Sequence, residues 1–187
     1  MTQRRAIFLD RDGVINANRP DHVKTWDEFV FLPGALAALR RIAASDFLVF
    51  VMTNQAAIAR GMTSDASVRD IHARMKAEVA RAGGRIDAVY YCPHLPEDNC
   101  ECRKPRPGLY VQGAREWNVD VARSYVVGDA LADIAAARAI SAPAILVLTG
   151  RGREQQAVLI ENNHSGYHIA DDLAGAVDWI WQREKLA

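Results

Sequence analysis

The stretch FLDRDGVIN, residues 8–16, decides both the fold and the expected chemistry, because an apolar strand runs directly into two carboxylates. Asp10 and Asp12 flank Arg11, and Gly13 follows them. Carboxylates this close repel each other unless a cation or a shared proton offsets their charge. Asp and Gly after a strand are also ordinary turn residues, so these nine letters alone are compatible with a plain turn. The rest of the chain has to distinguish the two interpretations.

The composition is typical of a globular protein with one domain. The 187 residues are 50% hydrophobic and 25% charged, and 23 Lys and Arg balance 23 Asp and Glu. Such neutrality gives no indication of a nucleic-acid or membrane partner. No apolar stretch approaches the ~18 residues that a membrane span needs, and the N-terminus lacks the apolar core of a signal peptide. We therefore predict a single domain over residues 1–187 that is cytoplasmic and monomeric and binds neither nucleic acid nor membrane.

Short β-branched or aromatic runs alternate with longer amphipathic segments, which predicts an α/β fold with a doubly wound, mostly parallel sheet. Strands buried on both faces are expected over residues 6–9, 47–53, 88–91, 124–128 and 143–149. The helices between them are expected to include Pro33 in one first turn, Ser64 as an N-cap and, at the start of the last helix, Asp171 or Asp172. The segment RGRE, residues 151–154, is expected to be a solvated loop, with contact to a distal phosphate as the alternative.

Polar side chains follow four of these strands, at the sheet edge where such folds bind ligands. They are Asp10 and Asp12, then Thr53 and Asn54, then Arg103 and Lys104, and finally Asp129 and Asp133. Carboxylate oxygens gathered with a lysine indicate a Mg²⁺ site that handles phosphate. One carboxylate can attack phosphorus, and the other can exchange protons with the leaving alcohol and with water if Arg11 swings outward.

The order of these motifs resembles the haloacid dehalogenase (HAD) superfamily. Asp-x-Asp-Gly after the first strand, Thr-Asn after the second, a Lys, and Gly-Asp-x-x-x-Asp after the fourth match its four-motif signature over residues 6–133. The segments LDRDGVIN, TNQAAIARG, CPHLPEDNCECRKP and VGDALADIAAA further resemble two sister branches, the D-glycero-D-manno-heptose 1,7-bisphosphate 7-phosphatases and the histidinol-phosphatases. The match as a whole disfavours the interpretation of residues 8–16 as a plain turn.

The resemblance implies a HAD-like Rossmannoid phosphatase with Asp10 as the nucleophile and Asp12 as the general acid and base. It implies that Mg²⁺ is held by the Asp10 side chain, the Asp12 backbone carbonyl and Asp129, and that Thr53 and Lys104 stabilise the phosphoryl group. The substrate would contact Arg103 and Lys104, residues 53–56 (Thr53, Asn54, Gln55, Ala56), and the loop of Asn18, Arg19, Pro20 and Asp21.

A second metal site is predicted from Cys92, His94, Cys100 and Cys102. Four ligands of this kind close a tetrahedral Zn²⁺ site and leave no open position, so the zinc would be structural. It would fix the loop that delivers Arg103 and Lys104. Three clustered cysteines also favour a metal site in a reducing compartment over a disulfide framework. An exposed loop with incidental thiols and a redox Cys-x-Cys pair are the alternatives.

The spacing between motifs leaves no room for the cap domain that many HAD enzymes insert, so loops would define a small phosphorylated sugar or amino-alcohol substrate. NQAAIARG resembles the heptose branch more than the histidinol branch. That branch commonly carries Lys directly after the metal Asp, where this chain has Ala130. The identity of the sugar phosphate substrate is therefore left open. Histidinol-phosphatase, another sugar-phosphate phosphatase, a phosphotransferase and a non-catalytic phosphometabolite-binding module are the alternatives.

Overall fold

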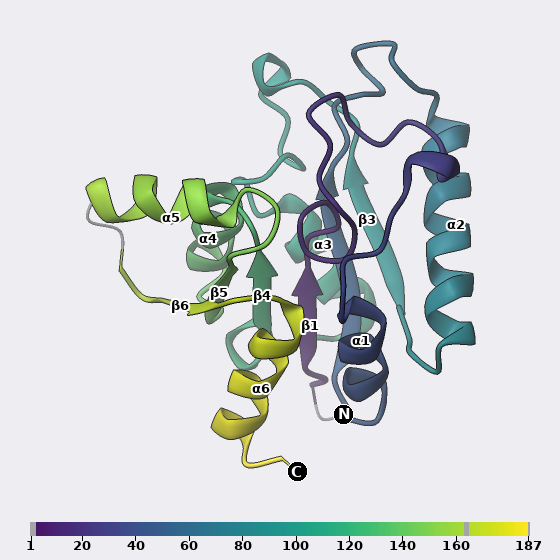
Figure 1. The fold of residues 1–187 in the computed structure, drawn as a ribbon. Coiled ribbons are helices and arrows are strands. Elements are labelled where there is room, and N and C mark those ends of the chain that lie inside the picture. The colour runs from purple at the N-terminus through teal and green to yellow at the C-terminus, as the bar shows by residue number, and fades with distance from the viewer. Residues whose placement is uncertain (1–2, 163–164, 187) are drawn as a thin grey trace.

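Six parallel strands form the centre of the protein. In the computed structural model, which describes residues 3–162 and 165–186, they are β1 (Ala6–Leu9), β2 (Leu48–Asn54), β3 (Ala88–Cys92), β4 (Tyr125–Gly128), β5 (Ala144–Val147) and β6 (Tyr167–Ala170). The order across the sheet is β3-β2-β1-β4-β5-β6, and every pairing is parallel. The predicted doubly wound α/β fold is confirmed (Figure 1).

Helices cover both faces of this sheet. They are α1 (Ala35–Ala43), α2 (Asp65–Arg81), α3 (Gly108–Trp117), α4 (Leu131–Ala139), α5 (Gly152–Glu161) and α6 (Leu173–Glu184), with short 3-10 turns at η1 (Trp26–Glu28), η2 (Pro96–Asp98) and η3 (Val121–Arg123). Side chains of α1, α2 and α6 join one buried cluster, and those of α3, α4 and α5 join the other. Within the described ranges, no helix combines the length and apolar character needed to cross a membrane.

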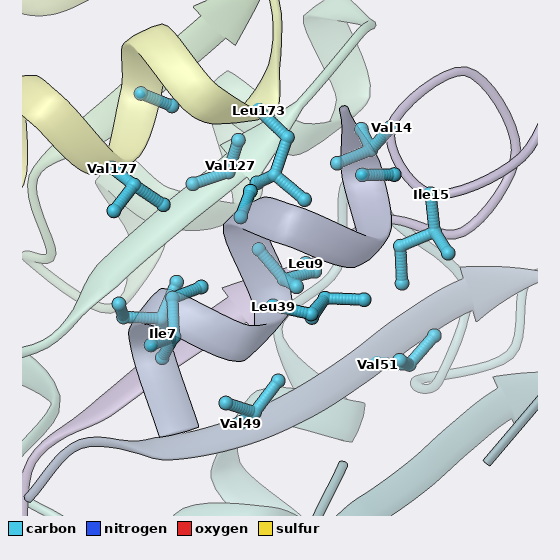
Figure 2. Packing of buried hydrophobic residues seen from close by; sticks show 14 of the residues in the cluster. Ile7, Leu9, Val14, Ile15, Leu39, Val49, Val51, Val127, Leu173 and Val177 are labelled. Carbon is cyan, nitrogen blue, oxygen red and sulfur yellow. The ribbon is translucent and has the colours of Figure 1, made fainter. Parts of the chain in front are cut away.

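The two clusters follow from the alternation of side chains along each strand. Ile7 and Leu9 of β1 point to the face covered by α1 and α6, where they pack with Val49, Val51 and Leu39 (Figure 2). Phe8 points to the opposite face, beneath α3. Both faces are buried, so the β1 and β2 sequences are continuous apolar runs. The central strands therefore form a rigid support for the residues at their ends.

Local signals placed most helix starts correctly. The Ser64 hydroxyl accepts a hydrogen bond from the Ser67 N–H at 3.0 Å, and Asp172 accepts one from the Gly175 N–H at 2.9 Å, so both predicted N-caps are confirmed. Pro33 was expected in a first helical turn, but α1 begins at Ala35.

Three expectations about elements were wrong. The strand β3 lies at an edge of the sheet, so most of its side chains are only half-buried instead of covered on both faces. The opposite edge strand, β6, was not predicted, because its short sequence YHIA is half-exposed and lacks an apolar run. Residues 152–154 are the first turn of α5 and not a loop; this helix buries few side chains, so its apolar periodicity is weak.

The active edge of the sheet carries loops and no inserted domain in the described part of the chain. The segment from Asp12 to Thr53 contains η1, α1 and β2, and the segment from Asn54 to Lys104 contains α2, β3 and η2. The fold is therefore capless, as predicted, and the ends of the central strands open directly onto a cavity.

Candidate active site

The site lies at the point where the winding of the sheet reverses, between β1 and β4. In sheets of this strand order, ligands bind beyond the carboxyl ends of the strands at this point. Asp10 directly follows β1 and Asp129 directly follows β4, and the Asp10 N–H donates to the Val127 carbonyl of β4 at 2.9 Å. Parallel pairing therefore brings two acids that are distant in sequence to one place.

A cavity of about 670 Å³ opens at this edge. The end of β2, the loops after five strands and the helices α4 and α5 line it: Asp10, Asp12, Asn18, Arg19, Pro20, His22, Thr53, Asn54, Ala56, Arg60, Arg103, Lys104, Pro105, Ala130, Leu131, Ala132, Asp133, Ala135, Arg151 and Gln155. Two of the predicted substrate residues, Asp21 and Gln55, are not part of this wall.

Lys104 is the cation at the floor of the cavity, and it is 4% exposed. Its Nζ lies 3.0 Å from Asp10 Oδ1, and it donates to Asp133 Oδ1 at 2.6 Å and to the Met52 carbonyl at 2.7 Å. Burial lowers the pKa of Lys104, but the charges of Asp10 and Asp133 more than reverse this effect and keep the pKa above its usual value. Lys104 is therefore a fixed positive charge beside Asp10.

Asn54 holds the Lys104 backbone in place. The Lys104 N–H donates to Asn54 Oδ1, and Asn54 Nδ2 donates to the Lys104 carbonyl, each at 3.1 Å. Asn54 was predicted to contact substrate; it lines the cavity, and its amide is also paired with the segment that carries the lysine. The end of β2 thereby fixes the loop that follows β3.

Three buried carboxylates lie together beside Lys104, whose ammonium pairs with two of them, Asp10 and Asp133. Ligating oxygens of Asp10, Asp129 and Asp133 all lie within 4.8 Å of one another. Burial raises the pKa of Asp10 to about 6 despite Lys104, and burial together with Asp10 and Asp133 raises the pKa of Asp129 to about 7. Asp129 Oδ1 is buried and has no hydrogen-bond partner among the described residues. This excess of hard, incompletely paired oxygen atoms fits a divalent cation such as Mg²⁺.

Two glycines let the backbone approach Asp129. A Cβ on Gly13 would lie 2.1 Å from Asp129 Oδ2, and one on Gly150 would lie 2.3 Å from the same atom. Both have positive φ angles, +88° and +56°, which glycine adopts without strain. The Gly13 of the opening motif is therefore required for close packing around the acid as well as for the turn.

Asp12 has its own cation, and here one prediction was wrong. Arg11 does not swing outward: it is 0% exposed, and its Nη2 donates to both Asp12 oxygens at 2.9 Å. Asn16 and Gln55 each donate a further bond of 2.9 Å to the same carboxylate. Burial raises the pKa of Asp12, but Arg11 and these two amides outweigh it and hold the pKa below its usual value. The two acids of the motif thus coexist because each is paired with a different cation.

Residues behind the motif complete this pairing. His72 Nε2 lies 3.1 Å from Arg11 Nη1, and burial and the Arg11 charge lower the pKa of His72 to about 3, so the neutral ring accepts the bond. Gln55 Nε2 also donates to Thr53 Oγ1 at 2.9 Å and thereby connects Thr53 with Asp12. Gln55 supports the site from beneath instead of facing the cavity. No local sequence signal relates His72 to Arg11, because the two meet only through packing of α2 on the sheet.

The loop after residue 16 supplies part of the cavity wall. Asn18, Arg19 and Pro20 line it, while Asp21 is paired with Arg19 at 3.1 Å and with Lys24 at 2.6 Å. His22, Arg60, Arg151 and Gln155 also line the cavity and were not among the predicted site residues. Arg60 lies within the TNQAAIARG motif. Arg151 follows β5, so its position after a strand was the sequence signal that could have identified it as a site residue.

The cysteine–histidine cluster forms beside Arg103. The three sulfur atoms lie 3.2–3.5 Å apart, and His94 Nδ1 lies 3.2 Å from Cys102 Sγ and 3.6 Å from Cys92 Sγ. Tetrahedral Zn–S bonds of about 2.3 Å place sulfur atoms about 3.8 Å apart, so the four side chains fit a zinc ion after a small expansion. Arg103 donates to the His94 carbonyl at 3.0 Å, which connects the cluster with the cavity wall.

Comparison with known proteins agrees with this geometry. A HAD-hydrolase-like family model matches residues 101–176. The D-glycero-beta-D-manno-heptose-1,7-bisphosphate 7-phosphatase of Pseudomonas aeruginosa is 40% identical over 179 residues, covering 96% of this chain and 99% of the relative. The chain belongs to this phosphatase family of HAD-like hydrolases. The Bordetella bronchiseptica family member is 41% identical over 180 residues, covering 95% of this chain and 98% of that relative.

Solved structures of the same family share the fold. The D,D-heptose 1,7-bisphosphate phosphatase of B. bronchiseptica, complexed with magnesium and phosphate, superposes with a TM-score of 0.90 at 40% identity, covering 96% of this chain and 99% of that one. The Burkholderia thailandensis enzyme superposes with a TM-score of 0.73 at 33% identity, covering 95% and 99%. The predicted family resemblance is confirmed.

The raised carboxylate pKa values predict a pH-dependent effect of Mg²⁺ on stability. Between about pH 4, where these acids titrate in the unfolded chain, and pH 7, the folded metal-free protein binds more protons at Asp10 and Asp129. Its free energy of unfolding therefore falls as pH rises through this range. Mg²⁺ binds the deprotonated form, so it should raise Tm more at pH 8 than at pH 5. Asp129→Asn should lose most of this increase in Tm. An equal effect of Mg²⁺ on the Tm of the wild type at both pH values would contradict a Mg²⁺ site at Asp10 and Asp129.

Proposed function

We propose that this protein is a Mg²⁺-dependent phosphatase that removes the 7-phosphate of D-glycero-D-manno-heptose 1,7-bisphosphate through an aspartyl-phosphate. The observation that carries the proposal is Asp10 at the floor of the cavity, 3.0 Å from the fixed charge of Lys104. Relatives that are about 40% identical over almost the whole chain bear the name of this activity. The open, capless cavity of about 670 Å³ suits a small phosphorylated sugar.

In the first step, an Asp10 oxygen attacks phosphorus and the bond from phosphorus to the sugar oxygen breaks. Lys104 and Thr53 stabilise negative charge on the phosphoryl oxygens, and Asp12 protonates the departing alcohol. Asp12 is a carboxylate in the free protein, and a phosphate dianion beside it raises its pKa and favours proton uptake. In the second step, Asp12 removes a proton from the water that attacks phosphorus, the bond from phosphorus to the Asp10 oxygen breaks, and inorganic phosphate leaves with Asp10 regenerated.

The residues that would hold Mg²⁺ are Asp10 and Asp129 through their side chains and Asp12 through its backbone carbonyl. When bound, the ion neutralises charge on the carboxylates and the phosphate. Asp133 is proposed to act through Lys104, because it accepts a bond from Nζ at 2.6 Å and leaves the ammonium directed at Asp10. Arg11 and Gln55 are proposed to orient Asp12.

The function is tested by phosphate release with Mg²⁺ from heptose 1,7-bisphosphate (both anomers) and from histidinol phosphate. We expect kcat/KM to favour the heptose by a hundredfold or more, about 2.7 kcal/mol of transition-state discrimination. The preferred anomer would define the reaction further. A preference for histidinol phosphate would assign the protein to the sister branch, and binding of either compound without phosphate release would favour a non-catalytic binding module.

Asp10→Asn should abolish turnover and leave the fold intact. The amide keeps the shape of the side chain but is not a nucleophile toward phosphorus. Phosphate release and thermal unfolding of this variant are compared with those of Asp70→Asn, an exposed acid on α2 that makes a surface pair with Arg74. The control should retain wild-type activity. Phosphate release by Asp10→Asn at the wild-type rate would show that another group is the nucleophile.

We propose that the cluster of Cys92, His94, Cys100 and Cys102 binds a structural Zn²⁺. Free thiols in this arrangement belong in a reducing compartment, in keeping with a cytoplasmic location. Its role would be to fix the loop that carries Arg103 and Lys104. The cluster uses all four positions of a tetrahedral ion, so no open position remains for chemistry.

Removal of zinc should therefore lower Tm more than it alters the chemistry. The protein is treated with a chelator, Mg²⁺ is restored, and zinc content, Tm and the activity of the remaining folded fraction are measured. We expect one equivalent of zinc in the untreated protein and a clear loss of Tm without it. Full retention of Tm in zinc-free protein, or loss of turnover in a protein that is still fully folded, would contradict a structural role.

A further inference from the structure

The arginines that line the cavity differ in how far their charges are already paired. Arg19 is paired with Asp21 at 3.1 Å. Arg60 and Arg103 have no carboxylate within 4.0 Å in the described part of the chain, and Arg103 donates instead to a backbone carbonyl of the zinc loop. Arg151 has one carboxylate neighbour, with 3.8 Å between its Nη2 and Oδ1 of Asp129.

Arg151 has a fixed backbone and a free side chain. Its N–H donates to Asp129 Oδ2 at 2.8 Å, which fixes the residue where β5 leads into α5. Its side chain is 53% exposed and lines the cavity, and across the described residues its guanidinium makes no hydrogen bond. The residue therefore presents an unused, fork-shaped donor group to the cavity.

Asp129, the acid next to this guanidinium, belongs to the proposed metal site. A divalent ion bound by Asp129 would take up the charge of that carboxylate, and Arg151 would then face the cavity without a counter-ion. Guanidinium groups in this situation bind phosphate well, because two parallel N–H donors match two phosphate oxygens. With the metal bound, the Arg151 guanidinium would therefore be free to pair with an anion of the ligand.

Arg151 comes from a different strand end of the sheet than Asp10 does. Asp10 follows β1 and Arg151 follows β5, with β4 between these strands, so roughly 10 Å separates the two strand ends. Figure 1 shows α5, which begins beside Arg151, on the side of the sheet opposite α2. The adjoining wall at the start of α4 consists of Ala130, Leu131, Ala132, Asp133 and Ala135, and it contributes no cation. On this wall Arg151 is therefore the cation available to a second anion.

We propose that Arg151 binds the second phosphate of the bisphosphate, the one that is not hydrolysed, and makes the enzyme prefer a bisphosphate to a monophosphate. This inference rests on the proposed function. Asp10, Lys104 and the metal site would take the phosphate that reacts, and Arg151 would fix the opposite end of the sugar. The residue would act on substrate choice and affinity, while the chemistry at Asp10 stays the same.

The test measures equilibrium binding without turnover, by calorimetry with Mg²⁺ on the Asp10→Asn background. Heptose 1,7-bisphosphate and heptose 7-phosphate are titrated into proteins with Arg151 intact and with Arg151→Gln. We expect Arg151→Gln to weaken bisphosphate binding about tenfold, the loss of one charge-assisted hydrogen-bond pair, and to leave monophosphate binding unchanged. Arg151→Lys, which keeps the charge without the fork, should recover part of the loss.

The matched control is Arg153→Gln, which removes the same charge two residues along α5 from an exposed position outside the cavity wall. It should affect neither ligand. Equal weakening of both ligands by Arg151→Gln would mean that Arg151 serves the metal site, and a selective loss in Arg60→Gln or Arg103→Gln but not in Arg151→Gln would place the second phosphate elsewhere. Either result would overturn the inference.

Parallel kinetics on the Asp10-containing proteins separate this inference from the proposed function. If the wild-type protein hydrolyses heptose 1,7-bisphosphate and Arg151→Gln does so with an unchanged KM, the proposed role of Arg151 is wrong and the proposed function stands. Wild-type protein that neither hydrolyses the bisphosphate nor binds it would contradict the proposed function itself. The supporting result is a raised KM for the bisphosphate in Arg151→Gln, with kcat preserved.

Discussion

The structure depends on burying several carboxylates close together at one edge of a sheet. An unpaired buried charge is very costly, so each acid needs a cation or a set of hydrogen-bond donors. Lys104 lies between Asp10 and Asp133, Arg11 pairs with Asp12, and Asp129 retains an oxygen without a partner in the described protein. The first three acids are paired with cations of the chain itself, whereas Asp129 has an oxygen that the proposed metal ion would bind. The position of the proposed metal site thus follows from which acid the protein leaves incompletely paired.

This pairing explains why remote segments of the chain converge here. Lys104 reaches Asp10 because the loop after β3 is held by Asn54 at the end of β2, and the cysteine–histidine cluster precedes it directly. A flexible loop would lose the lysine to solvent, because an ammonium group is better solvated in water than at the floor of a cavity. The Asn54 amide keeps a cation where the sheet alone would not hold it, and the zinc ion proposed for the cluster would serve the same purpose.

The polar groups at the two ends of the cavity differ in burial and in pairing. Around Asp10 the polar groups are buried, and ion pairs and hydrogen bonds with Lys104, Arg11 and Gln55 hold most of them in place, which gives the fixed electrostatic environment that stabilises charge in a transition state. Toward the opening, Arg60 and Arg151 are exposed and only weakly paired, so they can adapt to a ligand. With no cap domain over the site, such loops and their arginines are the part of the protein that can distinguish one small phosphate ester from another.

The sequence by itself determined the parallel α/β fold and the residues at the strand ends, because these depend on apolar runs and on the polar residues that directly follow them. It placed Asp10, Thr53, Lys104 and Asp129 at one edge, since parallel strands end on the same side. It did not determine the inward position of Arg11, its contact with His72, the supporting role of Gln55, or the edge elements β6 and α5. Only the tertiary structure decided these, because the partner of a buried charge is chosen by packing between segments far apart in the chain, and weakly buried elements leave little apolar periodicity to detect.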